Sequence, residues 1–212
     1  MFDYKLIPST IKDYVKNLNY TKDNLGRSGD IVLNFDNKYI LKISTKKEKL
    51  KREKEKNDWL INYIPVNKGI CFTENKTHAF YLKSYLDGIP LSNDKFTNNP
   101  DLLLTLLTKA LNLLSKVESK NCPFYSNDNI GNDFVHGDLC LPNILANDDE
   151  IIGFIDLENA GLGDKWYDYS WLLWSLSYNL ETSSYNEKLL SKLKLTFNEE
   201  KYNLYIPEDY RK

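Results

Sequence analysis

The stretch VHGDLCLPN at residues 135–143, followed by GFID at residues 153–156, carries most of the information about this chain. Asp138 and Asn143 lie in one predicted loop, and Asp156 ends the next predicted strand. A hairpin would bring these three oxygen-bearing side chains together. Phosphoryl transfer needs a carboxylate that positions the attacking hydroxyl, and oxygen ligands for Mg²⁺. We therefore predict Asp138 as the catalytic residue and Asn143 and Asp156 as metal ligands. The alternative is that they only form turns.

Length and composition indicate a globular protein. The chain has 212 residues, of which 42% are hydrophobic and 27% charged, enough for one domain or two small lobes. It lacks a run of about 18 apolar residues, and its start, MFDYKLIPST, does not have the pattern of a signal peptide. Cys71, Cys122 and Cys140 lack zinc-type spacing. These features predict a cytoplasmic protein with free thiols and no membrane span.

Charge is unevenly distributed along the chain. Residues 1–88 contain 17 Lys and Arg against 11 Asp and Glu, whereas residues 89–212 contain 11 against 19. A basic first part and an acidic second part suit a protein that binds a polyanion and a cationic partner, although drift can also produce such a distribution. Basic residues are not interleaved with aromatic residues in a patch, so we expect no nucleic-acid binding.

Hydrophobic patterning predicts a β-rich first part and a mainly helical second part. The turn Asp87-Gly88 marks the expected boundary, which gives an N-terminal lobe over residues 1–88, a hinge near 84–88 and a C-terminal lobe over residues 89–212. The elements expected are a hairpin at 31–41, a helix from 46 to 61, strands near 72 and at 80–82, a strand at 134–135, a hairpin at 144–155, and helices at 102–117, 169–180 and 187–195.

The first part also contains a candidate ion pair for a nucleotide site. Lys42 lies on a predicted strand and could reach nucleotide phosphates. Glu53 falls on one helical stripe with Leu50 and Leu60, which distinguishes it from the neighbouring glutamates. Ser28, in the segment Gly-Arg-Ser-Gly, could place backbone N–H groups at the phosphates. An ordinary surface pair is the alternative for Lys42 and Glu53.

These motifs resemble the aminoglycoside 3′-phosphotransferase (kanamycin kinase) family of the protein-kinase-like superfamily, with this chain as a shortened member. His136-Gly137-Asp138 stands where protein kinases have His-Arg-Asp, and Ile155-Asp156-Leu157 stands where they have Asp-Phe-Gly. The resemblance implies an α+β, two-lobed protein-kinase-like fold, with a small β-rich N-terminal lobe containing one helix and a larger, mainly α-helical C-terminal lobe. It also implies ATP as co-substrate and Mg²⁺ as cofactor.

The same resemblance implies further roles. The backbone of Ser84 and Leu86 would contact adenine. Ile40 stands where relatives have a stacking Tyr, so GTP is possible in place of ATP. His136 and Asp168 would support the catalytic loop, with Asp168 capping the helix that follows and accepting hydrogen bonds from the loop backbone.

The acceptor site is the part in which the resemblance is weakest. Longer relatives have a helical segment before the catalytic loop, where this chain has only residues 126–134. Four candidates remain for binding a cationic acceptor: Glu158, Glu181, Glu208 and Tyr210. Three functions therefore stay open: an aminoglycoside kinase that gives resistance, a kinase for another hydroxylated metabolite or antibiotic, and a non-catalytic nucleotide-binding relative. The sequence does not specify an oligomeric state.

Overall fold

The computed structural model describes residues 4–23, 29–126 and 130–211. The chain divides into two compact units: Met1–Asn62 with Val66–Asp87, and Tyr63–Pro65 with Gly88–Lys212. From Gly88 onward the chain belongs to the second unit only. In the described part of the chain, no helix is both long enough and apolar enough to cross a membrane.

The first unit is built on an antiparallel sheet with strand order β1-β2-β3-β5-β4. Its elements are the 3₁₀ turn Tyr4–Leu6, α1 (Ser9–Val15), β1 (Tyr20–Asp23), β2 (Ile31–Phe35), β3 (Tyr39–Ser44), α2 (Lys47–Leu60), β4 (Gly69–Glu74) and β5 (Ala79–Ser84). The predicted hairpin, helix and two further strands are confirmed. Helix α1 was not predicted, because its seven residues are too few to show a clear period.

The turn between β2 and β3 shows how local sequence fixes register. Asp36 and Asn37 both have positive φ, 48° and 52°. Two central residues with positive φ match the twist of a tight hairpin, and Asp and Asn tolerate that conformation well. Strand pairing then places Leu33 opposite Leu41. The turn residues thus set which side chains of β3 face each side of the sheet.

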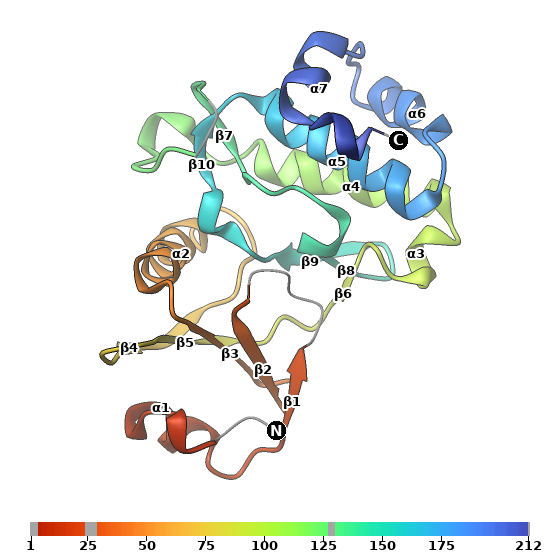
Figure 1. The fold of residues 1–212 in the computed structure, drawn as a ribbon. Helices are drawn as coiled ribbons and strands as arrows, with labels where there is room; N and C mark the ends of the chain where they lie inside the picture. Colours follow the sequence, from red (N-terminus) through yellow and green to blue (C-terminus); the bar gives the residue numbers. More distant parts are fainter. Residues whose placement is uncertain (1–3, 24–28, 127–129, 212) are drawn as a thin grey trace. The chain divides into compact units, whose positions relative to one another are not determined.

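Two helices cover opposite faces of this sheet, because successive strand residues point to opposite sides. Helix α1 packs with Ile11 and Val15 against a cluster that includes Phe80. Helix α2 packs with Leu50 against a second cluster that includes Tyr81. Figure 1 shows α1 and α2 on the two sides of the strands. Lys42, which is paired in register with Tyr81, shares the α2 side.

The second unit is mainly helical, with two small antiparallel sheets. Its strands are β6 (Ile89–Pro90), β7 (Asp133–Val135), β8 (Ile144–Asn147), β9 (Glu150–Phe154) and β10 (Gly161–Gly163). Its α-helices are α3 (Asp94–Thr97), α4 (Pro100–Leu114), α5 (Lys165–Leu180), α6 (Ser184–Lys192) and α7 (Glu199–Tyr205). Short 3₁₀ turns lie at Ser119–Asn121, Leu141–Asn143, Leu157–Asn159 and Glu208–Tyr210.

Most predicted elements of this unit are confirmed, whereas the start of α5 and the tail differ from the prediction. Helix α5 begins one turn earlier than expected, at Lys165, with the Asp164 side chain accepting a hydrogen bond from the backbone N–H of Trp166. Asp164, and not Asp168, is therefore the cap. Helix α7 forms in the segment expected to be a polar tail. Asn198 caps it by accepting from the N–H of Lys201.

Candidate active site

The loop from His136 to Asn143 follows β7 and is anchored from behind by helix α5. The two carboxylate oxygens of Asp168 accept hydrogen bonds from the backbone N–H groups of His136 (2.6 Å) and Gly137 (2.9 Å). Ser175 Oγ, two helical turns further along α5, accepts from the N–H of Leu141 (3.0 Å). The loop backbone is therefore fixed at both ends by side chains of a single helix.

Asp168 is buried, with 5% of its surface exposed. Burial raises the pKa of its carboxyl to about 7, although the hydrogen bonds from His136 and Gly137 act in the opposite direction. The expected contact between Asp168 and the loop backbone is thus present, and only the capping part of the prediction was wrong.

Asp138 and Asn143 meet within the loop. Asn143 Nδ2 donates to both the backbone carbonyl and the side-chain Oδ2 of Asp138, each at 2.9 Å. The carbonyl of Asn143 accepts a hydrogen bond from the N–H of Ile155 at 3.1 Å, which ties the loop to the residue before Asp156. Gly137, with φ of 80°, provides the left-handed backbone that turns the chain between His136 and Asp138. The hairpin brings the three predicted side chains into one region.

Burial raises the pKa of Asp138, and the nearby charge of Asp156 raises it further, while the hydrogen bond from Asn143 lowers it. Glu158 also raises the Asp138 pKa, so its carboxylate belongs to the same electrostatic environment. A raised pKa makes Asp138 a better proton acceptor in a reaction that deprotonates a hydroxyl.

The residues fit a magnesium ion in part. Asp156 has a left-handed backbone, φ 57° and ψ 49°, at the start of the turn Leu157–Asn159, and its side chain is exposed. Because Asn143 Nδ2 bonds Asp138, its Oδ1 remains as the oxygen for a ligand. The described residues contain no cluster of three His, Cys, Asp or Glu that would form a closed metal site. Two protein oxygens suit Mg²⁺, which usually keeps waters and substrate phosphates as its other ligands.

His136 is fully buried behind the loop, and its ring centroid lies 6.0 Å from that of Phe154. Burial lowers its pKa to about 4, against the opposing effect of the Asp156 charge, so the imidazole is neutral at pH 7. The side chain therefore supports the loop by packing and is in the wrong environment for a general base.

The His136 environment predicts a specific pH dependence of stability. A group whose pKa is lower in the folded state loses stability as the pH falls below its unfolded value of 6.5 toward about 4. Between pH 7.5 and 5, wild type should lose about 2 kcal/mol that His136→Leu does not lose. Urea unfolding of both proteins at the two pH values measures the difference. A gap that stays constant with pH would contradict the neutral, buried imidazole.

In the first unit, Lys42 and Glu53 form a buried ion pair. Lys42 Nζ on β3 lies 2.8 Å from Glu53 Oε2 on α2, and Glu53 has no exposed surface. The structure thus rules out the surface-pair alternative. Glu53 Oε1 binds a second ammonium, that of Lys83 on β5, at 2.7 Å. Asp30 Oδ2 lies 3.9 Å from Lys42 Nζ.

Two residues predicted to contact the nucleotide, Ser84 and Leu86, lie at or just after the end of β5. Ser84 pairs with Lys68 through its N–H and side-chain oxygen, and its carbonyl accepts from Asn67 Nδ2 at 2.8 Å. A carbonyl has two lone pairs, so one acceptor site of Ser84 remains for a ligand. Leu86 is half-buried just beyond the strand. Ser28 lies outside the described residues.

Two of the four acceptor candidates line a large cavity of about 960 Å³ in the second unit. Glu181, in a left-handed conformation after α5, and Tyr210 both contribute to its wall. The cavity is rich in aromatic side chains, namely Trp174, Tyr178, Phe197, Tyr202 and Tyr210, with Asp94 and Glu181 as its acids and Arg211 as its cation. Glu158 lies beside Asp156 in the chain and Glu208 is exposed, and neither lines this cavity. The structure therefore does not unite the four candidates in one site.

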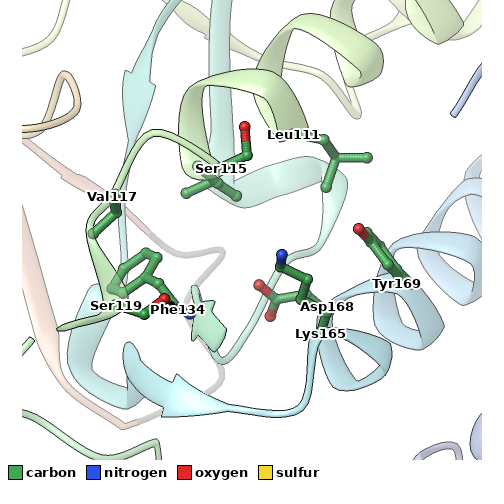
Figure 2. A pocket seen from close by; sticks show the side chains of 9 residues that line it. Leu111, Ser115, Val117, Ser119, Phe134, Lys165, Asp168 and Tyr169 are labelled. Carbon is green, nitrogen blue, oxygen red and sulfur yellow. Dashed lines mark hydrogen bonds between the residues drawn. The ribbon is translucent and has the colours of Figure 1, made fainter. Parts of the chain in front are cut away.

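A second, much smaller cavity lies between β7, the start of α5 and the C-terminal end of α4. Figure 2 shows Lys165, Asp168 and Tyr169 from α5 on one wall, and Leu111 from α4 with Ser115, the residue after this helix, on another. Its volume is about 70 Å³, far below the several hundred Å³ typical of ligand pockets. This cavity is a packing gap near the buried Asp168 and does not hold a substrate.

Sequence reasoning missed Lys83, Ser175, Asn67 and the aromatic wall of the large cavity. One sequence pattern could have predicted the position of Lys83. Strand alternation places it on the same face as Tyr81, and Tyr81 pairs with Lys42. No sequence pattern identified Ser175, because a serine in an apolar helix does not indicate which backbone N–H its hydroxyl will accept from.

Comparison with known proteins finds a family model and several curated relatives that match parts of this chain. The model of the phosphotransferase enzyme family matches residues 132–205, which contain the catalytic loop, the β8–β9 hairpin and α5. The probable aminoglycoside 3′-phosphotransferase of Lactococcus lactis is 27% identical, with 74% of this chain and 76% of that protein covered. An aminoglycoside 3′-phosphotransferase of Enterococcus faecalis is 24% identical over the same shares of both chains.

Solved structures show the same fold. The aminoglycoside phosphotransferase APH(3″)-Id from Streptomyces rimosus superposes with a TM-score of 0.80, at 18% identity and with 97% of each chain covered. An aminoglycoside-3′-phosphotransferase of type VIII gives 0.74, with 92% of this chain and 94% of that chain covered. These likenesses confirm the α+β protein-kinase-like fold. Residues 132–205 thus match the phosphotransferase enzyme family model, and about three quarters of the chain is similar to aminoglycoside 3′-phosphotransferases.

Proposed function

We propose that this protein is an ATP-dependent phosphotransferase that moves the γ-phosphoryl group to a hydroxyl of an aminoglycoside, in the manner of a 3′-phosphotransferase, and gives resistance. The observation that carries the proposal is the catalytic loop. It holds the Asp138 carboxylate against Asn143 Nδ2 at 2.9 Å, on a backbone anchored by Asp168. The Streptomyces rimosus relative was solved in complex with ADP and streptomycin.

Asp138 is the residue assigned to the acceptor hydroxyl. Its carboxylate accepts a hydrogen bond from that hydroxyl, orients the oxygen toward the phosphoryl group and takes up the proton as the new bond forms. Because the loop is already fixed by α5, little reorganisation is needed in the transition state. The raised pKa of Asp138 favours the proton transfer.

Lys42 is assigned to the nucleotide phosphates, with Glu53 holding its ammonium in place. The remaining lone pair of the Ser84 carbonyl and the N–H of Leu86 are assigned to the base. Ser28 is assigned to the phosphates through its backbone. Backbone contacts of this kind accept adenine readily, and guanine remains a second possibility to be tested with GTP.

Asn143 Oδ1 and the Asp156 carboxylate are assigned to Mg²⁺, which when bound neutralises charge on the nucleotide phosphates. Asp156→Ala should raise the Mg²⁺ concentration that gives half-maximal ATP turnover by about tenfold or more. Asp149→Ala, which removes an exposed carboxylate from the preceding hairpin turn, is the matched control and should keep the wild-type requirement. An unchanged metal requirement in Asp156→Ala would remove this assignment.

Two measurements together test the proposed function. A bacterial host that expresses the chain should tolerate more kanamycin or neomycin in broth dilution than the same host with the Asp138→Ala variant. Purified protein should consume ATP in a coupled assay only when the aminoglycoside is added. Turnover with ATP and Mg²⁺ but no rise in tolerance and no dependence on aminoglycosides would reject the antibiotic while keeping the kinase.

The aromatic cavity favours a second candidate, a kinase for another hydroxylated metabolite or antibiotic. Aromatic walls bind apolar or planar groups and cations over their faces, and among the described residues of the wall Asp94 and Glu181 are the acids. A panel of hydroxylated acceptors in the coupled assay distinguishes an aminoglycoside kinase from this second candidate. Turnover restricted to aminoglycosides would reject this candidate. Nucleotide binding without turnover on any acceptor would instead support a non-catalytic relative.

A further inference from the structure

A second buried lysine shares the carboxylate that holds Lys42. Lys83 has 4% of its surface exposed and its Nζ lies 2.7 Å from Glu53 Oε1, while Lys42 Nζ lies 2.8 Å from Oε2. Each oxygen of one fully buried carboxylate thus binds a different ammonium. Lys42 and Glu53 alone would form a simple ion pair. Because Lys83 binds the other oxygen of Glu53, the charge of this carboxylate is shared between two ammonium groups.

The sheet fixes this arrangement. In the β3–β5 pairing, Lys42 stands opposite Tyr81 and Ile40 stands opposite Lys83. Tyr81 and Lys83 are two residues apart on β5, so both side chains lie on the side of the sheet that α2 covers. Lys83 Nζ also lies 5.5 Å from the centre of the Tyr81 ring, a cation–π distance. The two lysines therefore approach Glu53 from two neighbouring strands.

Among the four described groups joined by ion pairs to Lys42 or Glu53, the charges sum to zero when Lys83 is counted. Lys42 and Lys83 bring two positive charges, and Glu53 and Asp30 bring two negative charges. Without Lys83 these four positions would carry a net charge of −1 around the ammonium that is assigned to the phosphates. Buried charges interact strongly because little water screens them, so one uncompensated negative charge would weaken the binding of a polyanion.

The ionisation of Glu53 agrees with this arrangement. Burial alone would raise the pKa of its carboxyl, but the charges of Lys83 and Lys42, with their hydrogen bonds, lower it to about 2. Glu53 therefore stays ionised at neutral pH, with its charge divided between two ammonium groups.

We propose that Lys83 is a positioning residue of the nucleotide site. By taking one oxygen of Glu53, it keeps Lys42 oriented and leaves more of the Lys42 charge for the nucleotide phosphates. This inference rests on the proposed function, since it takes a nucleoside triphosphate as the ligand of Lys42. It assigns Lys83 no contact with the nucleotide, and its effect passes through Glu53.

Lys83→Met removes the charge and keeps a similar length. Titration calorimetry with ATP should show a dissociation constant that is about 10- to 100-fold weaker, the range for loss of one nearby charge at an effective protein dielectric of about 20. The KM for ATP should rise in parallel while kcat at saturating ATP stays within about threefold, because uniform binding is lost. Lys83→Arg, which keeps the charge, should restore most of the affinity.

Lys54→Met is the matched control. Lys54 pairs with Asp58 at 2.6 Å on the exposed side of α2, so its loss removes a lysine from the same unit without touching Glu53. Its ATP affinity should stay within about twofold of wild type, as expected for an exposed pair. A merely structural role of Lys83 would lower the melting temperature of Lys83→Met but leave its ATP affinity unchanged, and that result would overturn the proposal.

A double-mutant cycle tests the route through Glu53 and covers the case in which Lys83→Met does not fold. The double variant Glu53→Gln/Lys83→Met contains no unpaired buried carboxylate. Relative to Glu53→Gln alone it should lose clearly less ATP affinity than Lys83→Met loses relative to wild type, because Lys83 then has no carboxylate to share. Additive losses would overturn the indirect role. Failure of wild type to bind ATP would instead reject the proposed function and this inference together.

Discussion

Asp138→Ala is expected to lower kcat by about 10²- to 10⁴-fold, the usual contribution of a positioned general base, and to leave the free energy of unfolding nearly unchanged. The stability argument comes from the contacts of the loop. Asn143 Nδ2 retains its bond to the backbone carbonyl of residue 138 when the side chain is removed. The raised pKa of Asp138 also means that its ionised form is unfavourable in the folded protein, so the deletion relieves repulsion from Asp156.

The measurement combines steady-state kinetics with urea unfolding. Asp138→Asn keeps the shape but removes the proton acceptor, and it should lose nearly as much rate as Asp138→Ala. Asp149→Ala serves again as the carboxylate control outside the loop. If Asp138→Ala retained more than about a tenth of the wild-type rate, Asp138 would lose its assignment as the catalytic residue.

Asp168→Ala, in contrast to Asp138→Ala, is expected to lose much of the stability of the fold. Two buried amides, those of His136 and Gly137, would each lose their acceptor. An unsatisfied buried donor costs about 1–3 kcal/mol, so the free energy of unfolding should fall by about 2–5 kcal/mol. The loop would also lose its anchor to α5, and kcat should fall even though Asp168 is assigned no contact with either substrate.

Asp164→Ala, at the cap of the same helix, is the control for this variant. It removes a partly exposed carboxylate, which accepts from the N–H of Trp166, from Lys201 Nζ and from the Tyr205 hydroxyl, and should cost about 1–2 kcal/mol. Asp168→Asn retains one oxygen acceptor and should fall between wild type and Asp168→Ala. A loss of less than about 1 kcal/mol in Asp168→Ala would show that the buried contacts with the loop contribute little.

The pH dependence of the Asp168 variants has a definite sign. The pKa of Asp168 is raised from 3.8 to about 7 in the folded protein. A carboxyl with a raised pKa contributes stability that is fully present below its unfolded value and is lost as the pH rises through the folded value. The stability difference between wild type and Asp168→Asn should therefore shrink as the pH increases from about 4 to about 7. A difference that grew over this interval would contradict the raised pKa.

Much of the candidate site could be predicted from local sequence, because its residues are close together in the chain. Asp138 and Asn143 share one loop, and the turn at Asp148 brings Asp156 back to it. The Lys42–Glu53 pair was predictable for a different reason. The helical stripe that buries Leu50 also points Glu53 toward the sheet.

The errors of the sequence analysis have a common physical cause, which is dependence on distant partners. Asp168 could be placed near the start of α5, but only the packed structure shows that Asp164 caps the helix while Asp168 reaches the loop. Helices α1 and α7 are short, and helices of that length depend on tertiary packing more than on propensity.

By itself, the sequence determined the longer elements, the loop that carries Asp138 and Asn143, and the hairpin that returns Asp156, because turn chemistry and side-chain periodicity act over a few residues. Tertiary structure alone decided which buried charges meet. Lys83 and Glu53 are 30 residues apart and Asp168 and His136 are 32 apart, and their contacts exist only because a sheet and a helix bring those positions together. Burial then set the pKa values of these groups, since desolvation depends on the surroundings of a side chain and not on its neighbours in the chain.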